Sequence, residues 1–304
     1  MKFFILITLL TIVESALLYK DFSSTRNFKI LGHARHNPVN KTMELISEGS
    51  YASKTHKVCS IWTKKQIYWQ DGFEIKLVFR MRTPDSSNDG GEGFAINFQQ
   101  DRPVAVGDLR SKGERPQVNG KTYYPSGIGF NELRKSWSIK FDMRPTTTDA
   151  TRKVHVSVHT GGDWLKVHPQ NAFTDELPTL NNNHNHVVKI YYDKEPSGGV
   201  LRMYWTSDFE GNHTWGTWNT PILEVPMTMP HLDERPAWFG FTSATGFDRV
   251  QTVDLMGLVY HEIRHINGNG DKCIVCGGIN PRCCLHWEML KEEKDSNLPR
   301  AGPR

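Results

Sequence analysis

The sequence predicts an all-β protein, an antiparallel β-sandwich or barrel, and three observations lead to that class. The run from Phe73 to Arg80 places a bulky apolar residue at every second position, which is the period of a strand with one buried face. From about Phe22 to Tyr260, short strand-like runs follow one another with turn residues between them. No long helical pattern occurs before the end of the chain, and many short strands without intervening helices indicate a sandwich or barrel.

The chain begins with a segment that is typical of a secretory signal peptide. Lys2 precedes the apolar run Phe3–Val13, and Val13 and Ser15 suit a cleavage site. The run is short for a helix that spans a bilayer, and a buried N-terminal strand is the alternative. We therefore expect residues 1–15 to be removed and the mature protein to be secreted and soluble, without membrane insertion.

A series of strands then occupies most of the chain. The expected strands are residues 28–31, 57–62, 73–80, 94–98, 137–141, 154–158, 187–191, 201–205, 238–242 and 253–259. Between the fourth and the fifth, Pro103–Ser136 holds glycines, prolines and charges with little periodicity. Such a long irregular segment is often a functional loop.

Charge and composition exclude one class of partner. The formal charge of +4 is small for 304 residues and the basic residues are scattered, so we expect no nucleic-acid partner. Because we expect the protein to be exported, its two sequons are candidate N-glycosylation sites, one at Asn40 and one at Asn212.

The stretch GGEGFAINFQQD, Gly90–Asp101, carries the first candidate site residue. Its apolar residues alternate from Phe94 onward, which predicts a strand with one buried face. Glu92 stands between two glycines at the mouth of this strand. An acid in that position is either part of a turn or part of a binding site.

Six segments, in this order along the chain, resemble the L-type lectin family of legume lectins and their bacterial and animal relatives. The segments are NFKILGHA, Ser60–Thr63 with Asp71–Phe79, GGEGFAINFQQD, SWSIKFDM, Val154–Val158 and Trp238–Gly246. The resemblance implies a concanavalin A-like jelly roll, an antiparallel β-sandwich, in a soluble member of animal or bacterial type. We place this domain at residues 16–266.

The resemblance also implies a shallow sugar site built from loops. Glu92 matches an acid that accepts hydrogen bonds from sugar hydroxyls, although it is one methylene longer than the usual Asp. Phe247 would offer an apolar face to the sugar. Each of these matches has an alternative. Glu92 would be a solvated turn acid, the loop with Gly127 and Gly129 would be a plain turn, and Phe247 would be a hydrophobic plug between loops. The matching residues are Glu92, Gly127, Gly129, Arg144, Thr146, Gly246 and Phe247.

The family's metal loop is where the sequence departs most from the resemblance. Asp142, Asp149 and His155 match metal ligands, but Lys140 stands where the family has a Glu. An ammonium group cannot ligate a cation and repels one. We therefore expect that the transition-metal site is lost, that Lys140 pairs with Asp142, and that His155 is structural. Calcium at Asp142 and Asp149 is the remaining cofactor hypothesis.

The residues after the last strand, 267–304, are polar and rich in cysteine, and we treat them as a separate tail with a short helix at Leu285–Lys294. Cys273, Cys276, Cys283 and Cys284, with His286 nearby, are either disulfide partners or zinc ligands, and export favours disulfides. The total of five cysteines is odd, so one thiol is free or pairs between chains. Cys59 lies in a strand, where it would be buried.

Two function hypotheses follow, and neither is an enzyme. Related sandwich glycosidases carry two carboxylates on one strand face, whereas Ser138, Lys140 and Asp142 supply one. The first hypothesis is a secreted lectin that binds glycans or glycoproteins, with a degenerate metal site. A single shallow site binds weakly, so a homo-oligomer would supply avidity. The second is an extracellular structural or adhesion protein on a lectin scaffold that no longer binds sugar.

Overall fold

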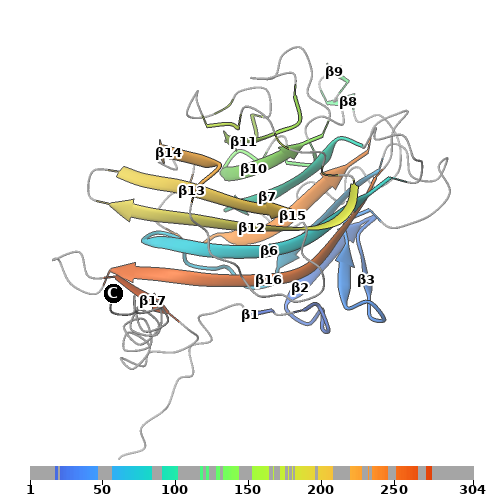
Figure 1. Cartoon of the computed structure of the whole chain (residues 1–304), viewed down its shortest axis with the longest axis horizontal. Coiled ribbons are helices and arrows are strands. Elements are labelled where there is room, and N and C mark those ends of the chain that lie inside the picture. The colour runs from blue at the N-terminus through green and yellow to red at the C-terminus, as the bar shows by residue number, and fades with distance from the viewer. Residues whose placement is uncertain are drawn as a thin grey trace, which may run out of the picture.

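The computed structural model contains two large antiparallel sheets that lie on one another (Figure 1). It describes residues 18–19, 21–46, 57–83, 91–101, 117–118, 121–122, 128–130, 133–143, 153–163, 167, 172–174, 177, 180, 182–195, 198–207, 220–227, 232, 235–245, 251–265 and 272–275. These ranges contain no helix, and hence none that is long and apolar enough to cross a membrane. The predicted all-β antiparallel sandwich is confirmed.

The smaller sheet has six strands in the order β11-β10-β7-β15-β5-β2, all antiparallel. Its central strand, β7, pairs with β10 on one side and β15 on the other. The strands are β2 (Phe28–Gly32), β5 (Val58–Thr63), β7 (Gly93–Gln99), β10 (Ser136–Asp142), β11 (His155–Thr160) and β15 (Trp238–Ala244).

The larger sheet has nine strands, with the path β14-β13-β12-β6-β16-β4-β3. Three short strands, β4, β1 and β17, pair with successive parts of one side of the long strand β16. The strands are β1 (Leu18–Tyr19), β3 (Arg35–Asn37), β4 (Thr42–Glu44), β6 (Gly72–Arg82), β12 (Asn182–Glu195), β13 (Gly198–Ser207), β14 (Leu223–Met227), β16 (Thr252–His265) and β17 (Lys272–Val275).

The segments on either side of the sandwich are partly described. Within the predicted irregular segment Pro103–Ser136, β8 (Gln117–Val118) and β9 (Lys121–Thr122) form a small hairpin. Strand β17 belongs to the region that the sequence predicted to be a separate tail, and it extends the nine-stranded sheet. The helix predicted at 285–294 lies outside the described residues.

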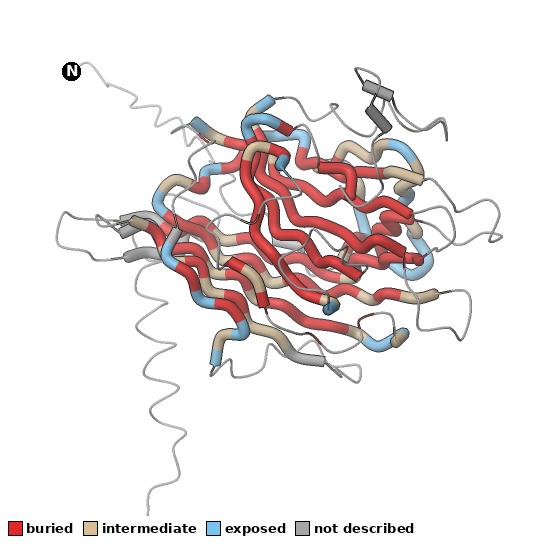
Figure 2. The backbone as a smooth tube through the Cα atoms, turned by 90° about the horizontal axis from the view of Figure 1, so that it is seen from above, coloured by how far each residue is buried: buried red, intermediate tan, exposed pale blue. Residues whose placement is uncertain are grey.

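An aromatic core fills the space between the two sheets. Residues that alternate along β7 and β10 point inward, and the rings of Phe94 and Phe141 stack with centroids 4.4 Å apart. Phe79 of the larger sheet meets Phe94 edge-on at 4.9 Å, so the two layers interdigitate through their rings. The central strands are accordingly buried along most of their length (Figure 2).

A second, smaller apolar cluster covers the outer face of the six-stranded sheet. Ile128, Phe130 and Leu133 pack there against Trp62 and Ala95, which point away from the main core. We call Ile128–Phe130 the roof turn. Phe130 also packs against His159 of β11, with ring centroids 5.5 Å apart.

Candidate functional site

Glu92 lies at the entrance of β7, between the ends of two neighbouring strands. Its backbone carbonyl accepts a hydrogen bond from the N–H of Met143, just beyond β10, at 3.1 Å. On the other side, the Ser243 hydroxyl of β15 donates to the carbonyl of Gly93 at 2.6 Å. Glu92 is only 4 % exposed, so its carboxylate is held within the structure and not on an open turn. The alternative of a solvated turn acid is therefore wrong.

The glycine after Glu92 is required by close backbone contact. Gly93 has a φ of +121°, and a Cβ atom there would lie 2.0 Å from the carbonyl oxygen of Phe141. The absence of a side chain lets β7 approach β10 this closely. The glycine therefore fixes where the Glu92 backbone sits.

The roof turn reaches the same end of the sheet. A Cβ on Gly129 would lie 3.2 Å from both Thr242 Cβ and Val58 Cγ1, and the side chain of Ile128 lies against Gly93. The structure thus brings Gly129 to the strand ends that flank Glu92.

The remaining predicted sugar-site residues lie outside the described residues. Arg144 directly follows Met143 at the end of β10, and Gly246 directly follows Thr245 at the end of β15. The ends of β10 and β15, which these residues follow in the sequence, therefore lie on either side of Glu92. The residues whose structure is not described are Gly127, Arg144, Thr146, Asp149, Gly246 and Phe247.

Lys140 and Asp142 form a buried ion pair on the outer face of β10, as the sequence predicted. Their side chains are 1 % and 2 % exposed. A buried ammonium is tolerated only beside a partner of opposite charge, and Asp142 supplies that charge. The pair lies close to Glu92 in the sheet, because Asp142 is the ladder partner of Gly93, the residue directly after Glu92.

His155 lies directly opposite Asp142 in the pairing of β10 with β11. Its Nδ1 donates to the carbonyl oxygen of Lys153 at 2.8 Å, and the residue is 1 % exposed. This hydrogen bond anchors the imidazole to its own strand entrance, which fits the predicted structural role.

The described residues do not fit the family's transition metal. They contain no group of three or more His, Cys, Asp and Glu side chains that would hold a metal ion. The carboxylate of Asp142 already bonds to the Lys140 ammonium, which occupies the neighbouring position with a positive charge. We derive no role for a metal at this place. Asp149, the other predicted calcium ligand, is not among the described residues.

Gln251 is a site residue that the sequence did not single out. It precedes β16, is fully buried, and its side chain lies against Gly91, the neighbour of Glu92. The sequence signal was slight, since it is one polar residue between Val250 and Thr252 at the start of a strand.

Cys59 is a free thiol in the core, as expected from its place in a strand. Burial raises its pKa far above the ordinary value. The tail then contributes Cys273, Cys276, Cys283 and Cys284, whose side chains are not described. Setting Cys59 aside leaves an even number of cysteines in the tail, so no bridge between chains is required.

The two sequons differ in what is described. Asn40 is exposed in the turn between β3 and β4, where a glycan would have room. Its N–H donates to the side-chain oxygen of Asn37 at 3.1 Å. Asn212 lies outside the described part of the chain.

Comparison with solved structures identifies the fold. No family description and no curated protein matches the chain. The lectin of Bauhinia forficata, in complex with GalNAc, matches with a TM-score of 0.58 at 17 % identity, over 81 % of this chain and 96 % of that one. The basic lectin of winged bean, with Tn-antigen, matches with a TM-score of 0.60 at 16 % identity, over 81 % of this chain and 96 % of its own. Arcelin-5, a lectin-like defense protein of Phaseolus vulgaris, matches at 0.57 and 14 % identity, over 82 % and 97 %.

These similarities establish the class of architecture. The chain has the concanavalin-like jelly-roll fold of the legume lectins, as the resemblance of its segments implied. At these identities the likeness shows the fold alone, and the function has to be argued from the site.

Proposed function

We propose that the protein is a secreted, non-enzymatic lectin that binds glycan hydroxyls in a site around Glu92. One observation carries the proposal: Glu92, the roof turn and the ends of β10 and β15 converge at one end of the six-stranded sheet. The segments that leave from these ends carry Arg144, Thr146, Gly246 and Phe247. Residues that reach a single carboxylate from several strand ends can hold a sugar from more than one side.

The chemistry of the carboxylate supports the same function. Two carboxylate oxygens accept hydrogen bonds from neighbouring hydroxyls, and bonds to a charged acceptor are stronger than bonds to a neutral one. Repeated use of such a site on one assembly would supply the avidity that a single site lacks.

The buried Lys140–Asp142 pair supports a site that needs no transition metal. In this proposal the ammonium neutralises the carboxylate at the end of β10 and steadies the strand from which residues 144–152 leave. The hypothesis that Asp142 and Asp149 hold calcium is tested by a calcium titration.

A glycan array with a Glu92→Gln variant tests the function. Loss of the charged acceptor without loss of side-chain size should abolish binding to every glycan that the wild type captures. Glu224→Gln is the matched control, because Glu224 is an exposed acid on the other sheet. Equal signals from wild type and Glu92→Gln at every glycan would contradict the proposed site.

The second candidate is an extracellular structural or adhesion protein that has lost sugar binding. The replacement of a metal-ligand position by Lys140 favours it, as does the fold shared with a protein described as lectin-like. Capture of an extracellular protein that free sugars do not displace, together with an empty glycan array, would establish this candidate over the first.

A further inference from the structure

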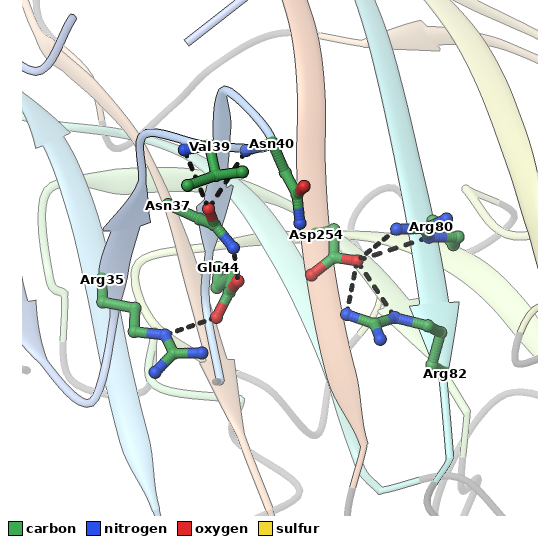
Figure 3. A network of polar contacts seen from close by, with 8 residues as sticks. All are labelled: Arg35, Asn37, Val39, Asn40, Glu44, Arg80, Arg82 and Asp254. Atoms are coloured by element: carbon green, nitrogen blue, oxygen red, sulfur yellow. Dashed lines mark hydrogen bonds and ion pairs between the residues drawn. The ribbon is translucent and has the colours of Figure 1, made fainter. Parts of the chain in front are cut away.

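Asn40 lies in the turn of the β3–β4 hairpin, where it is open to solvent. All residues between the two strands are exposed, and Val39, the residue before Asn40, is 88 % exposed. The turn holds Asn40 through its backbone, because its N–H donates to the side-chain oxygen of Asn37 at 3.1 Å (Figure 3). The same oxygen accepts the N–H of Val39 at 3.2 Å. The hairpin therefore presents Asn40 at a fixed place with space around it.

The third residue of the sequon is in the opposite situation. Thr42 is the first residue of β4, is 3 % exposed and pairs with Asn37 across the hairpin ladder. A sequon is defined by its Asn and by the hydroxyl residue two positions later, so an enzyme that reads it has to contact both. Lys41, between them, has a φ of +54°, which fixes a tight turn. An enzyme therefore cannot reach Thr42 once the hairpin has taken its place in the sheet.

The hairpin takes that place late in the synthesis of the chain. A short ladder, in which Glu44 pairs with Asp254, joins β4 to β16, and the N–H of Leu45 donates to the carbonyl oxygen of Val253 at 2.9 Å. A hairpin of two short strands is marginal in water without such a neighbour. Strand β16 follows Asn40 by about 210 residues, which take roughly 10–40 s to synthesise. The sequon therefore stays accessible to an enzyme during that time.

We propose that Asn40 is an N-glycosylation site that is modified before β4 pairs with β16, and that the folded protein is no longer a substrate. This inference rests on the secretion that the proposed function includes. The donor is an oligosaccharide linked through pyrophosphate to a lipid carrier. Nδ2 of Asn40 forms a bond to the anomeric carbon of the first sugar and gives up one proton. The bond from that carbon to the pyrophosphate oxygen breaks, and the lipid pyrophosphate leaves.

The exposure of the turn allows the modified chain to fold. A glycan is bulky and solvated, so it fits only on a surface. Asn40 is exposed in the finished hairpin, and its glycan would extend from the turn without displacing a buried residue. The same hairpin thus closes access to Thr42 and leaves room for a glycan that is already attached.

The site is tested on the full chain, made in eukaryotic cells that secrete it. Mass spectrometry after treatment with an amidase that converts a glycosylated Asn to Asp reports the modified fraction at Asn40. Nearly every wild-type chain should carry the glycan. Asn40→Gln and Thr42→Val should each lose it, and Thr42→Val does so with the acceptor Asn in place and with a buried side chain of the same shape. Asn212→Gln is the matched control and should keep the glycan at Asn40.

The timing is tested by a pulse–chase measurement on the same wild-type protein. The glycosylated fraction of labelled full-length chains should be the same at the end of a short pulse and at the end of the chase. Resistance to protease follows folding in the same samples. A glycosylated fraction that rises after the chains have become resistant to protease would show that the folded hairpin is still a substrate, and would overturn the proposed order of events.

The outcomes separate this inference from the function on which it rests. If the protein is secreted with residues 1–15 removed but Asn40 is unmodified in it, the inference is wrong and secretion stands. A modification at Asn40 that persists in Thr42→Val would contradict it as well, because no sequon would then be required. If the chain stays inside the cell with residues 1–15 attached, secretion and the modification fall together. The glycan array with Glu92→Gln bears on sugar binding alone.

Discussion

Lys140 places an ammonium group inside the protein, where a charge needs a partner of opposite sign. It is fully buried on the outer face of β10, with its ammonium on the carboxylate of Asp142. Its neighbours across the ladders are Ala95 and Ser157, which bring no further charge. The stability of this corner of the sheet therefore depends on the two charges remaining together.

Replacing Lys140 with methionine should lower the free energy of unfolding by about 3–5 kcal/mol, because Asp142 would be left as a buried charge without its partner. Urea denaturation followed by tryptophan fluorescence measures the change. Arg202→Met is the matched control, since the Arg202–Glu224 pair has side chains 30 % and 51 % exposed and should contribute under about 1 kcal/mol. Equal losses of unfolding free energy in the two variants would mean that the buried pair stabilises the protein no more than the exposed pair does.

The candidate site was predictable from sequence where residue type and spacing were informative. Glu92 between glycines and Lys140 two residues before Asp142 both carried that information, and the ion pair was predicted and found. Gln251 was not predictable, because its place in the site comes from contact with Gly91, which lies 160 positions away in the sequence. No local pattern records such a contact.

At the scale of the element, β7 is held close to β10 by the absence of a side chain at position 93. Gly93 faces Asp142 in the ladder, and its hypothetical Cβ would meet the backbone of Phe141. Backbone atoms cannot rotate away as a side chain would. A larger residue at this position must therefore push the entrance of β7, including Glu92, out of place.

Gly93→Ala should destabilise the protein by more than Gly198→Ala, and should weaken glycan binding. Both glycines have positive φ values, +121° and +130°, but a Cβ at Gly198 would meet nothing within 4 Å. The second variant therefore measures the backbone strain alone, and the difference between the two measures the collision with β10. Thermal unfolding and array binding of both variants provide the comparison. Matching melting temperatures would show that β7 can move away at no cost.

Ion pairs between side chains join neighbouring strands on the outer face of the nine-stranded sheet (Figure 3). Asp254 of β16 accepts hydrogen bonds through one oxygen from Arg80 at 3.1 Å and Arg82 at 2.8 Å, both on β6. Directly across the ladder, Glu44 of β4 binds Arg35 at 2.5 Å. The Arg35–Glu44 pair thus joins β3 to β4 within the hairpin that has Asn40 in its turn, and the short ladder between β4 and β16 joins this hairpin to the rest of the sheet.

The elements themselves were largely predictable. The ten expected strands all fall on strands of the structure, because alternation of apolar residues reports a half-buried strand directly. The extent of β12, β13 and β16 was underestimated, since their outer faces are polar and the alternation fades toward their ends. β14 was missed because it is short, contains Pro226 and lies at the edge of the sheet, where proline is tolerated.

For the whole molecule, burial of His261 predicts a loss of stability in acid. Burial lowers the pKa of His261 below its ordinary value of 6.5, although Glu74 opposes the change. The unfolded chain then binds a proton at a higher pH than the folded protein does. The stability that comes from the neutral imidazole is complete above about pH 6.5 and is lost as the pH falls below that value.

Melting temperatures between pH 7.5 and 5 test this expectation. His261→Gln should show a smaller decline toward acid than wild type, because the variant no longer carries the group whose protonation favours unfolding. His184→Gln, at an exposed position, should decline as wild type does. Parallel curves for all three proteins would assign the acid sensitivity to other groups.

Divalent cations should have little effect on the whole molecule. Since the Lys140 ammonium already neutralises Asp142, neither a chelator nor millimolar calcium should shift the melting temperature or the array profile. Calorimetry of chelator-treated protein, with and without added calcium, gives the measurement. A rise of several degrees with calcium would show that Asp149 and its neighbours complete a site after all.

The long strand β16 runs from the end of the sandwich that holds Glu92 to the end that holds β17. Gln251 stands at its start, beside Glu92, whereas β17 pairs with its last residues, Glu262–His265. Fourteen residues of strand place these points roughly 40 Å apart. Protein coupled to a sensor chip through residues next to β17 would therefore be held at the end of β16 that is remote from Glu92.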